Sequence, residues 1–274
     1  MTVLILGGGG QLGRELHNAI PGSVPLGHSN IDGIDLLASA EKIIETIESY
    51  FPDVIINASA MTNVDRCETE QNTALMINGV SLKHITEAAR SANAYLVHVS
   101  TDYVFDGKEG NYKEDSPPNP VNYYGLSKLI GDIYANSYGN SIVVRTSGVF
   151  GHLPNFPRYA YDTLKAGKEL KVMEGYYSPI HARQLAESIS EILDTKPVGF
   201  LNIAGERTSR FELAQKLCRL YGFDSNLVQK FSQDLKFVAK RPFDSSLNID
   251  KAKENISADF YNIEKGLKLL ANQQ

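Results

Sequence analysis

Two apolar patterns alternate through the first half of the chain. Short runs rich in Val, Ile and Leu predict strands, and longer stretches with apolar residues three or four positions apart predict helices. We expect the strands at Val3–Leu6, Val24–Leu26, Val54–Asn57, Tyr95–Ser100 and Ile142–Thr146. We expect the helices at Gln11–Ala19, Ala38–Tyr50, Ala74–Ala92 and Tyr123–Tyr138. This alternation predicts an α/β fold, a doubly wound parallel sheet with helices on both faces.

The pattern becomes less regular after Gly151. A loop from Leu153 to Tyr161, rich in Pro, Asn and aromatic residues, precedes a predicted helix near Asp162–Ala166. The other elements that we expect are strands at Leu170–Met173 and Gly199–Ala204 and helices at Ala182–Leu193 and Arg210–Tyr221. Because no flexible linker separates the halves, we expect the second half to fold onto the first.

Composition narrows the classes of partner. The chain has 27 basic and 32 acidic residues among 274, a formal charge of −5, which argues against a nucleic-acid or anionic membrane surface. Cys67 and Cys218 lack metal-ligand spacing, so we expect them to pack in a reducing, cytoplasmic setting. The histidines also lack ligand spacing, and no metal site is predicted. The N-terminus has no basic leader, and no apolar run approaches the roughly 18 residues of a membrane span.

A glycine-rich segment lies between the first predicted strand and the first predicted helix. It reads Gly7-Gly8-Gly9-Gly10-Gln11-Leu12-Gly13, with glycines at its first, fourth and seventh places. Glycines there allow a tight turn and a close approach of the backbone to a pyrophosphate, and the helix N-terminus offers free N–H groups. The segment predicts a Rossmann site for NADP(H) or NAD(H).

The acidic residue that often holds the ribose 2′-hydroxyl at the end of the second strand is not evident. His28 and Ser29 stand near that place, and Arg14 could also reach a 2′-phosphate. We therefore expect NADPH to be at least as acceptable as NADH. Asp32 is the alternative acid if the strand ends elsewhere, and we interpret Glu15, after the glycine segment, as a solvated carboxylate at the helix start.

Three side chains form a candidate catalytic set. Tyr124 and Lys128 are four residues apart in a predicted helix and so share one face. A nearby ammonium group is expected to lower the pKa of the phenol, so that Tyr124 can exchange a proton near neutrality. Thr101 or Ser100, at the end of the fourth strand, could hydrogen-bond the substrate carbonyl.

These segments resemble the dTDP-4-dehydrorhamnose reductase family, and the likeness runs through nearly the whole chain. The segments that carry it are the glycine loop, residues 57–65 (Asn-Ala-Ser-Ala-Met-Thr-Asn-Val-Asp), residues 100–107 (Ser-Thr-Asp-Tyr-Val-Phe-Asp-Gly), residues 124–128 (Tyr-Gly-Leu-Ser-Lys) and residues 145–147 (Arg-Thr-Ser). The family often has a tryptophan after Arg-Thr-Ser, packed against the sugar, whereas this chain has Gly148 and no tryptophan.

The resemblance implies NAD(P)H-dependent reduction of the C4 keto group of dTDP-4-dehydrorhamnose to dTDP-L-rhamnose, and a homodimer. It implies that Tyr124 donates the proton, that Thr101 polarises the C4 oxygen and that Lys128 assists. We assign cofactor binding to Gly7, Gly10, Gln11, Leu12, His28, Ser29, Asp35, Leu36, Ala58, Ser59, Ala60, Ser100, Tyr124 and Lys128. We assign substrate binding to Thr62, Val64, Asp102, Tyr103, Phe105, Asn155 and Arg241.

The predicted domain boundaries follow from these assignments. Residues 1–150 would form the NAD(P)-binding Rossmann domain, completed by segments near 176–205, and residues 151–175 and 206–274 mostly the smaller C-terminal substrate-binding region. Two alternatives remain open at this point. One is a reductase or epimerase of another nucleotide sugar, since one scaffold hosts many activities. The other is a non-catalytic NADP-binding regulatory subunit similar to the β subunit of methionine adenosyltransferase.

Overall fold

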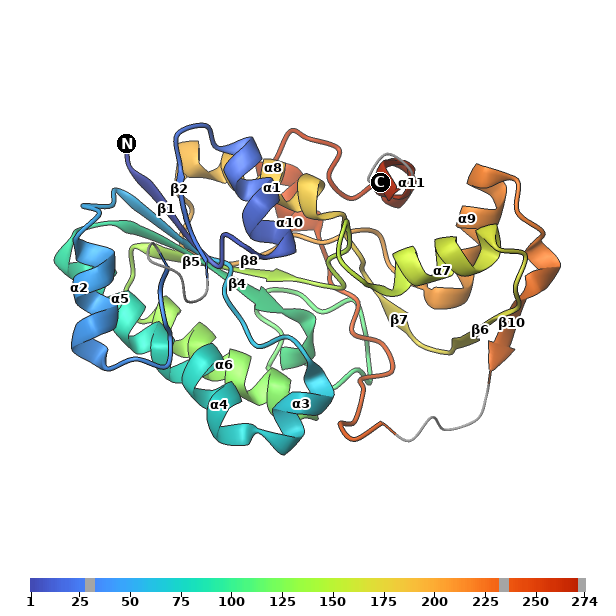
Figure 1. Cartoon of the computed structure of the whole chain (residues 1–274), viewed down its shortest axis with the longest axis horizontal. Coiled ribbons are helices and arrows are strands. Elements are labelled where there is room, and N and C mark those ends of the chain that lie inside the picture. The colour runs from blue at the N-terminus through green and yellow to red at the C-terminus, as the bar shows by residue number, and fades with distance from the viewer. Residues whose placement is uncertain (28–32, 232–236, 271–274) are drawn as a thin grey trace.

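A six-stranded parallel sheet forms the centre of the computed structural model, which describes residues 1–27, 33–231 and 237–270 (Figure 1). Its strands, in the spatial order β2-β1-β3-β4-β5-β8, are β1 (Val3–Leu6), β2 (Val24–Leu26), β3 (Val54–Asn57), β4 (Tyr95–Thr101), β5 (Ser141–Thr146) and β8 (Gly199–Asn202). The chain runs outward in one direction from β1 to β2 and in the other from β3 onward. Ligands of such sheets bind outside the carboxyl ends of the strands at this switch point. The predicted doubly wound fold is confirmed.

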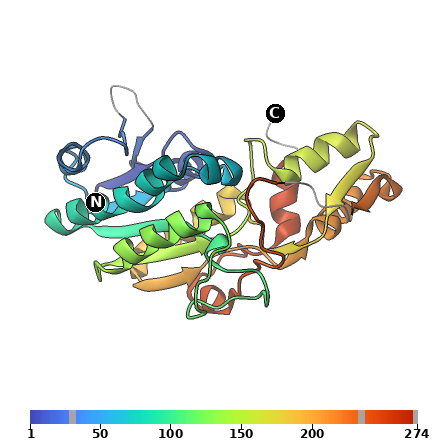
Figure 2. The same ribbon diagram turned by 90° about the horizontal axis from the view of Figure 1, so that it is seen from below.

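Helices cover both faces of the sheet (Figures 1 and 2). On one face lie α1 (Gln11–Ala19) and α8 (Ala182–Thr195), and on the other lie α2 (Ala40–Glu48), α5 (Ser81–Ser91) and α6 (Tyr123–Asn136). Alternate residues of a strand point to opposite faces. Val3 and Ile5 therefore join the core under α1, whereas Leu4 and Leu6 join the core under α2. Burial on both faces explains why β1 is an unbroken apolar run.

A π-helical turn interrupts the long helix that the sequence predicts over Ala74–Ala92. The structure instead has α4 (Gln71–Leu75), a π-helical turn (Met76–Val80) and then α5. The turn brings Asn78 inward, where its side chain accepts a hydrogen bond of 2.8 Å from Met61 N and donates one of 3.1 Å to Ser127 Oγ. Short π turns are common at functional sites. This one links α6 to the chain that follows β3.

The rest of the chain packs beside the carboxyl end of the sheet (Figure 1). Its strands are β6 (Leu170–Met173), paired in parallel with β10 (Val228–Phe231), and β7 (Tyr176–Tyr177), antiparallel to β9 (Thr208–Ser209). Its helices are α7 (Phe156–Lys165), α9 (Arg210–Tyr221) and α11 (Ile263–Leu269), with a short turn at Ser225–Leu227. The helix α10 (Asp250–Asn255) instead packs against β8 of the large sheet, and another short turn, Asp102–Val104, follows β4. α7, α9, α11, β6 and β10 share one apolar core. In the described ranges, no helix is long and apolar enough to cross a bilayer.

Two local predictions were wrong. The predicted loop before Asp162 is largely the first turns of α7, because Asn155 caps that helix by accepting a hydrogen bond of 3.0 Å from Arg158 N. The proline that suggested a loop lies within the first helical turn, where no hydrogen bond from its nitrogen is needed. Glu15 is not solvated: only 7% of it is exposed, and Oε2 lies 3.4 Å from Arg183 Nε of α8.

The segment after residue 236 returns to the large sheet and packs against residues that follow β3 and β4. Asp65 of α3 (Val64–Thr69) accepts a hydrogen bond of 2.9 Å from Ala239 N. The Asn122 side chain donates one of 2.9 Å to Lys240 O, and Asp244 N donates one of 3.0 Å to Gly107 O. The last part of the chain is thereby fixed to residues that follow β3 and β4.

Candidate active site

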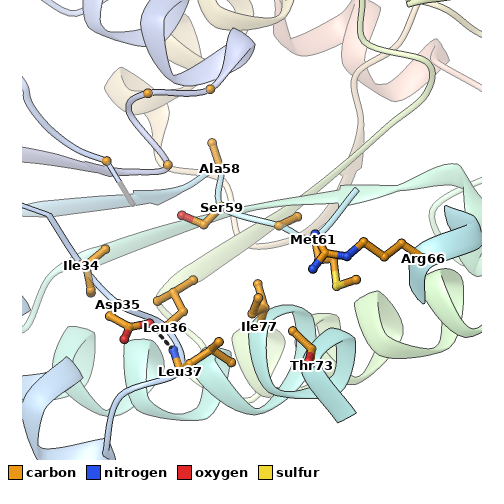
Figure 3. A pocket seen from close by; sticks show the side chains of 15 residues that line it. Ile34, Asp35, Leu36, Leu37, Ala58, Ser59, Met61, Arg66, Thr73 and Ile77 are labelled. Atoms are coloured by element: carbon orange, nitrogen blue, oxygen red, sulfur yellow. Dashed lines mark hydrogen bonds between the residues drawn. The ribbon is translucent and has the colours of Figure 1, made fainter. Parts of the chain in front are cut away.

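A first cleft, of about 600 Å³, lies at the switch point of the sheet (Figure 3). It is bounded by the ends of β1, β2 and β3. Seven of the residues assigned to the cofactor line it: Gly7, Gly10, Asp35, Leu36, Ala58, Ser59 and Ala60. Figure 3 shows the side chains of residues 34–37 on one side of the cleft and Ala58 and Ser59 on another. This agrees with a dinucleotide that follows the ends of the strands.

The glycine segment forms a cradle that side chains would fill. A Cβ at Gly13 would lie 2.2 Å from Gly7 O, and one at Gly7, whose φ is +84°, would lie 2.8 Å from Ser59 N. Gly9 faces open space. Gly10 precedes α1 and offers no side-chain cap, so the first N–H groups of the helix are left for a ligand. These residues fit a pyrophosphate.

Other residues assigned to the cofactor lie outside the lining of this cleft. The Gln11 side chain donates to Val149 O and accepts from Leu153 N, which fixes the loop after β5. Leu12 packs in the core under α1. His28 and Ser29 fall outside the described residues, as does Asp32. Ser100, Tyr124 and Lys128 are described with the catalytic set below.

Sequence reasoning missed four side chains of the far wall: Met61, Arg66, Thr73 and Ile77. Arg66 reaches toward the cleft from α3 (Figure 3) and makes a bidentate pair with Glu70, with distances of 2.7 and 2.9 Å. The sequence signal for it was the Asn63 cap, which accepts a hydrogen bond from Arg66 N and starts α3. A short helix after a strand end places its first turn at the ligand edge.

The second cleft, of about 830 Å³, adjoins the first at Met61 and Thr62. Six residues assigned to the substrate line it: Thr62, Val64, Asp102, Tyr103, Asn155 and Arg241. Phe105 does not. Its ring is fully buried, stacked on Tyr112 at 4.3 Å between ring centroids, so it supports the cleft from behind.

The candidate catalytic residues stand between the two clefts. Tyr124, in the first turn of α6, packs on Met61 on one side and lies edge-on to Tyr103 at 5.8 Å between ring centroids on the other. A side-chain hydrogen bond joins Tyr124 to Thr101 at the end of β4. Lys128 is one helical turn further on and donates a hydrogen bond of 2.7 Å from Nζ to Val99 O. The predicted set is thus assembled in space.

Burial dominates the ionisation of this set. It raises the pKa of Tyr124 above its ordinary value, outweighing the hydrogen bond with Thr101, so the expected lowering by Lys128 is not seen here. Burial also lowers the pKa of Lys128 to about 8, although Asp132 opposes the shift. The phenol therefore holds its proton at neutral pH.

Asp102 is a buried carboxylate beside Thr101. Only 3% of it is exposed, and it accepts hydrogen bonds from Ser147 Oγ at 2.7 Å, Ser245 Oγ at 2.5 Å and Thr101 Oγ1 at 3.1 Å. Burial raises its pKa to about 6, although the three hydroxyls favour the ionised form. It links β4, β5 and the C-terminal segment at the floor of the second cleft.

A buried cluster of polar side chains lies between α6 and the sheet, close to Lys128. Asp132 of α6 lies 3.4 Å from Arg145 Nε and 3.6 Å from His98 Nε2. Asn57 Nδ2 lies 3.3 Å from His98 Nδ1. Burial and the charge of Lys128 lower the pKa of His98, so the imidazole is neutral. Ser100 is also buried here, beside Asp132, and it lowers the pKa of that carboxyl, although burial raises the pKa more. This places it behind the catalytic set.

Arginine and aromatic side chains line the second cleft. At one rim Arg241 Nη2 lies 3.1 Å from Asp65 Oδ2, and its guanidinium is 5.1 Å from the ring centroid of Phe237. Arg210, which sequence reasoning did not single out, also lines this cleft. The aromatic side chains that line this cleft are Phe156, Tyr176, Tyr177, Phe231, Phe237 and Phe243. Flat rings and guanidinium groups suit a nucleotide.

The comparisons with known proteins agree with this geometry. The family model described as RmlD substrate binding domain matches residues 1–274. A dTDP-4-dehydrorhamnose reductase of Escherichia coli K12 is 30% identical over 299 residues, covering 100% of this chain and 98% of its own. The probable low-salt glycan biosynthesis reductase Agl14 of Haloferax volcanii is 28% identical over 294 residues, covering 98% and 97%.

Solved structures match the whole fold. The crystal structure of a hypothetical dTDP-4-dehydrorhamnose reductase from Sulfolobus tokodaii is 43% identical, with a TM-score of 0.90 over 97% of this chain and 99% of that one. A dTDP-4-dehydrorhamnose reductase from Bacillus anthracis, in complex with NADP, is 26% identical, with a TM-score of 0.90 over 100% and 99%.

Proposed function

The chain belongs to the RmlD substrate binding domain family, and from that membership we propose that it reduces the C4 keto group of dTDP-4-dehydrorhamnose to give dTDP-L-rhamnose. It is an NAD(P)-binding protein, like its relative with bound NADP. The observation that carries the proposal is the position of Tyr124 between a dinucleotide cradle and a cleft lined by arginine and aromatic side chains. The relatives from Escherichia coli and Sulfolobus tokodaii support the choice of sugar.

The catalytic roles follow from the geometry of the set. NADPH or NADH supplies the hydride when bound. Tyr124 donates a proton to the C4 oxygen, and its raised pKa keeps the phenol protonated and ready for a reduction that consumes a proton. Thr101 steadies the same oxygen by a hydrogen bond. Lys128, one turn away and held by its hydrogen bond to Val99 O, assists by binding the cofactor beside Tyr124.

The remaining assignments are part of the same proposal. The glycine cradle and Ala58–Ala60 hold the cofactor, and Arg241 binds the nucleotide portion of the substrate. Residues 1–150 with segments near 176–205 form the cofactor domain, and residues 151–175 and 206–274 mostly form the substrate region. The family resemblance supports a homodimer in the cytoplasm. Light scattering, which gives the molar mass in solution, tests the dimer.

The test is oxidation of NADPH and of NADH with enzymatically prepared dTDP-4-dehydrorhamnose, followed by the absorbance of the reduced nicotinamide. We expect turnover in the wild type and loss of about 100-fold or more in Tyr124→Phe, because general acid catalysis contributes about 10²–10⁴-fold. Tyr134→Phe, a tyrosine of the same helix that packs against the core under α2, is the matched control and should keep its activity. Cofactor binding without turnover would instead favour a reductase of another nucleotide sugar or the regulatory-subunit alternative.

One observation favours a second candidate, a reductase of a different nucleotide sugar. Gly148 has a φ of +48°, and a Cβ there would lie 2.8 Å from ring carbons of Tyr177. The tyrosine ring thus takes space that a larger side chain at position 148 would need. The relative named as a low-salt glycan biosynthesis reductase supports other sugars in this group. A panel of nucleotide-linked 4-keto sugars, compared by kcat/KM, separates the two candidates.

A further inference from the structure

Arg210 is a cation in the second cleft whose role neither the catalytic set nor the family match assigns. It is the first residue of α9 and lines the cleft with Tyr177 and Phe156, whose ring centroids lie 5.1 and 5.6 Å from its guanidinium. In residues 1–27, 33–231 and 237–270 it has no carboxylate within 4.0 Å. Its neighbour Arg207, in contrast, pairs with Asp244 at 2.7 Å. A guanidinium held among aromatic rings without an acid is suited to a bound anion.

The helix start itself does not provide the anion site. Ser209 and Glu212 form a complete capping box, which occupies their own backbone N–H groups and places the Glu212 carboxylate at the start of α9, where it repels an anion. An anion here must be held by side chains. The Arg210 side chain therefore carries the site.

Two buried polar atoms nearby also lack partners in the described part of the chain. One is the Tyr177 hydroxyl, on a residue only 8% exposed, and the other is Arg241 Nη1. Buried donors without partners cost free energy unless a ligand or water satisfies them. Both belong to residues that line the same cleft as Arg210.

Tyr103 relates these groups to the catalytic set. The charges of Arg210 and Arg241 both act on its phenol, although they come from different elements, α9 and the segment after residue 236. The Tyr103 ring in turn lies edge-on to Tyr124. The two guanidinium groups therefore share a cleft with Tyr103, the ring that contacts the proton donor. Asp102 and Glu174 are the acids of the cleft, and Asp102 is already held by three hydroxyls.

We propose that Arg210 and Arg241 form a two-arginine clamp for the diphosphate of the substrate, with the Tyr177 hydroxyl donating a third hydrogen bond. In a 4-keto sugar attached through C1 to a diphosphate, the sugar ring separates the phosphates from C4, and Tyr103 both lines the cleft of the clamp and contacts Tyr124. This inference rests on the proposed function for its ligand class and adds Arg210 as the residue that selects a diphosphate. Guanidinium groups bind phosphate by paired hydrogen bonds.

The experiment is calorimetric titration of the protein saturated with NADPH, so that nucleotides do not enter the cofactor cleft. The probes are dTDP, dTMP and thymidine, with UDP and GDP to cover other bases. We expect Arg210→Ala to weaken dTDP by about 10- to 100-fold, dTMP by less, and thymidine not at all. Arg210→Lys should recover part of the loss. Arg219→Ala, an exposed arginine of the same helix, is the control for net charge and should bind dTDP as the wild type does.

Three results would overturn the clamp. These are dTDP affinity within twofold of wild type in Arg210→Ala, an equal loss for thymidine and dTDP, or a wild type that binds none of the nucleoside diphosphates. Unchanged NADPH affinity in each variant shows that the variant is folded. The outcome is separate from the proposed function: a protein that binds dTDP through Arg210 but does not reduce the keto sugar contradicts the reaction and keeps the clamp.

Discussion

Replacing Asp102 by Asn should make stability less dependent on pH. The wild-type carboxyl has a pKa of about 6 in the fold against 3.8 ordinarily, because burial outweighs the hydrogen bonds from three hydroxyls. A raised carboxyl pKa means that its contribution to stability is fully present below the unfolded pKa and is lost as the pH rises through the folded pKa. Asp102→Asn is not ionised, and the hydroxyls can rotate to accept from its amide.

The magnitude follows from the shift in pKa. A difference of about 2 units amounts to about 3 kcal/mol between fully protonated and fully ionised Asp102. Between pH 8 and pH 5 the carboxyl recovers about 1.4 kcal/mol of this, since the folded group is then mostly protonated while the unfolded group remains ionised. The unfolding free energy of Asp102→Asn minus that of wild type should therefore be greater at pH 8 than at pH 5 by this amount.

Urea unfolding at the two pH values measures the difference directly. Asp115→Asn, which removes an exposed carboxyl, controls for the change in net charge. A difference between Asp102→Asn and wild type that is the same at both pH values would refute the reasoning, because it would show that the Asp102 carboxyl does not titrate between them. Substrate KM, measured in parallel, reports what the ionised carboxyl contributes to the cleft.

Three further substitutions test separate parts of the site. Gly13→Ala places a Cβ 2.2 Å from a carbonyl oxygen of the glycine loop, so NADPH affinity by fluorescence titration should fall at least tenfold, and unchanged affinity would exclude the cradle. Asp65→Ala removes the partner of Arg241, so the substrate KM should rise about tenfold with kcat nearly unchanged; a fall in kcat alone would contradict this. Gly148→Ala, at a φ of +48° and 2.8 Å from the Tyr177 ring, should lower thermal stability by about 1–3 kcal/mol, and an unchanged melting temperature would show that the ring moves freely.

The strands and the glycine cradle were predictable because their signals are local. Val3–Leu6 is a continuous apolar run followed by glycines, and both the strand and its turn appear where expected. The clustering of Thr101 with Tyr124 was also predictable, since the carboxyl ends of parallel strands meet at one edge of the sheet. In these cases the pattern and the packing impose the same structure.

Residues whose surroundings come from distant parts of the chain were not predictable. Glu15 is an acid in the first turns of a helix, and only its partner Arg183 on α8 explains its burial. Phe105 belongs to a string assigned to the substrate, yet it turns inward onto Tyr112. Arg210 looked like an ordinary helix residue because its aromatic neighbours come from α7 and β7. Tertiary packing alone gives these residues their roles.

The order in which the chain supplies its two clefts has a consequence for synthesis. Every residue that lines the first cleft precedes Asn78, and the large sheet is complete with β8 at Asn202. The second cleft still needs Arg241 and Ser245, which leave the ribosome near the end. Because chains fold from the N-terminus as they emerge, the nascent protein acquires its cofactor site before its substrate site. The last residues also complete the core under α1, through Leu247, Ile249 and Phe260, so their loss would weaken the cofactor domain as well as remove the substrate site.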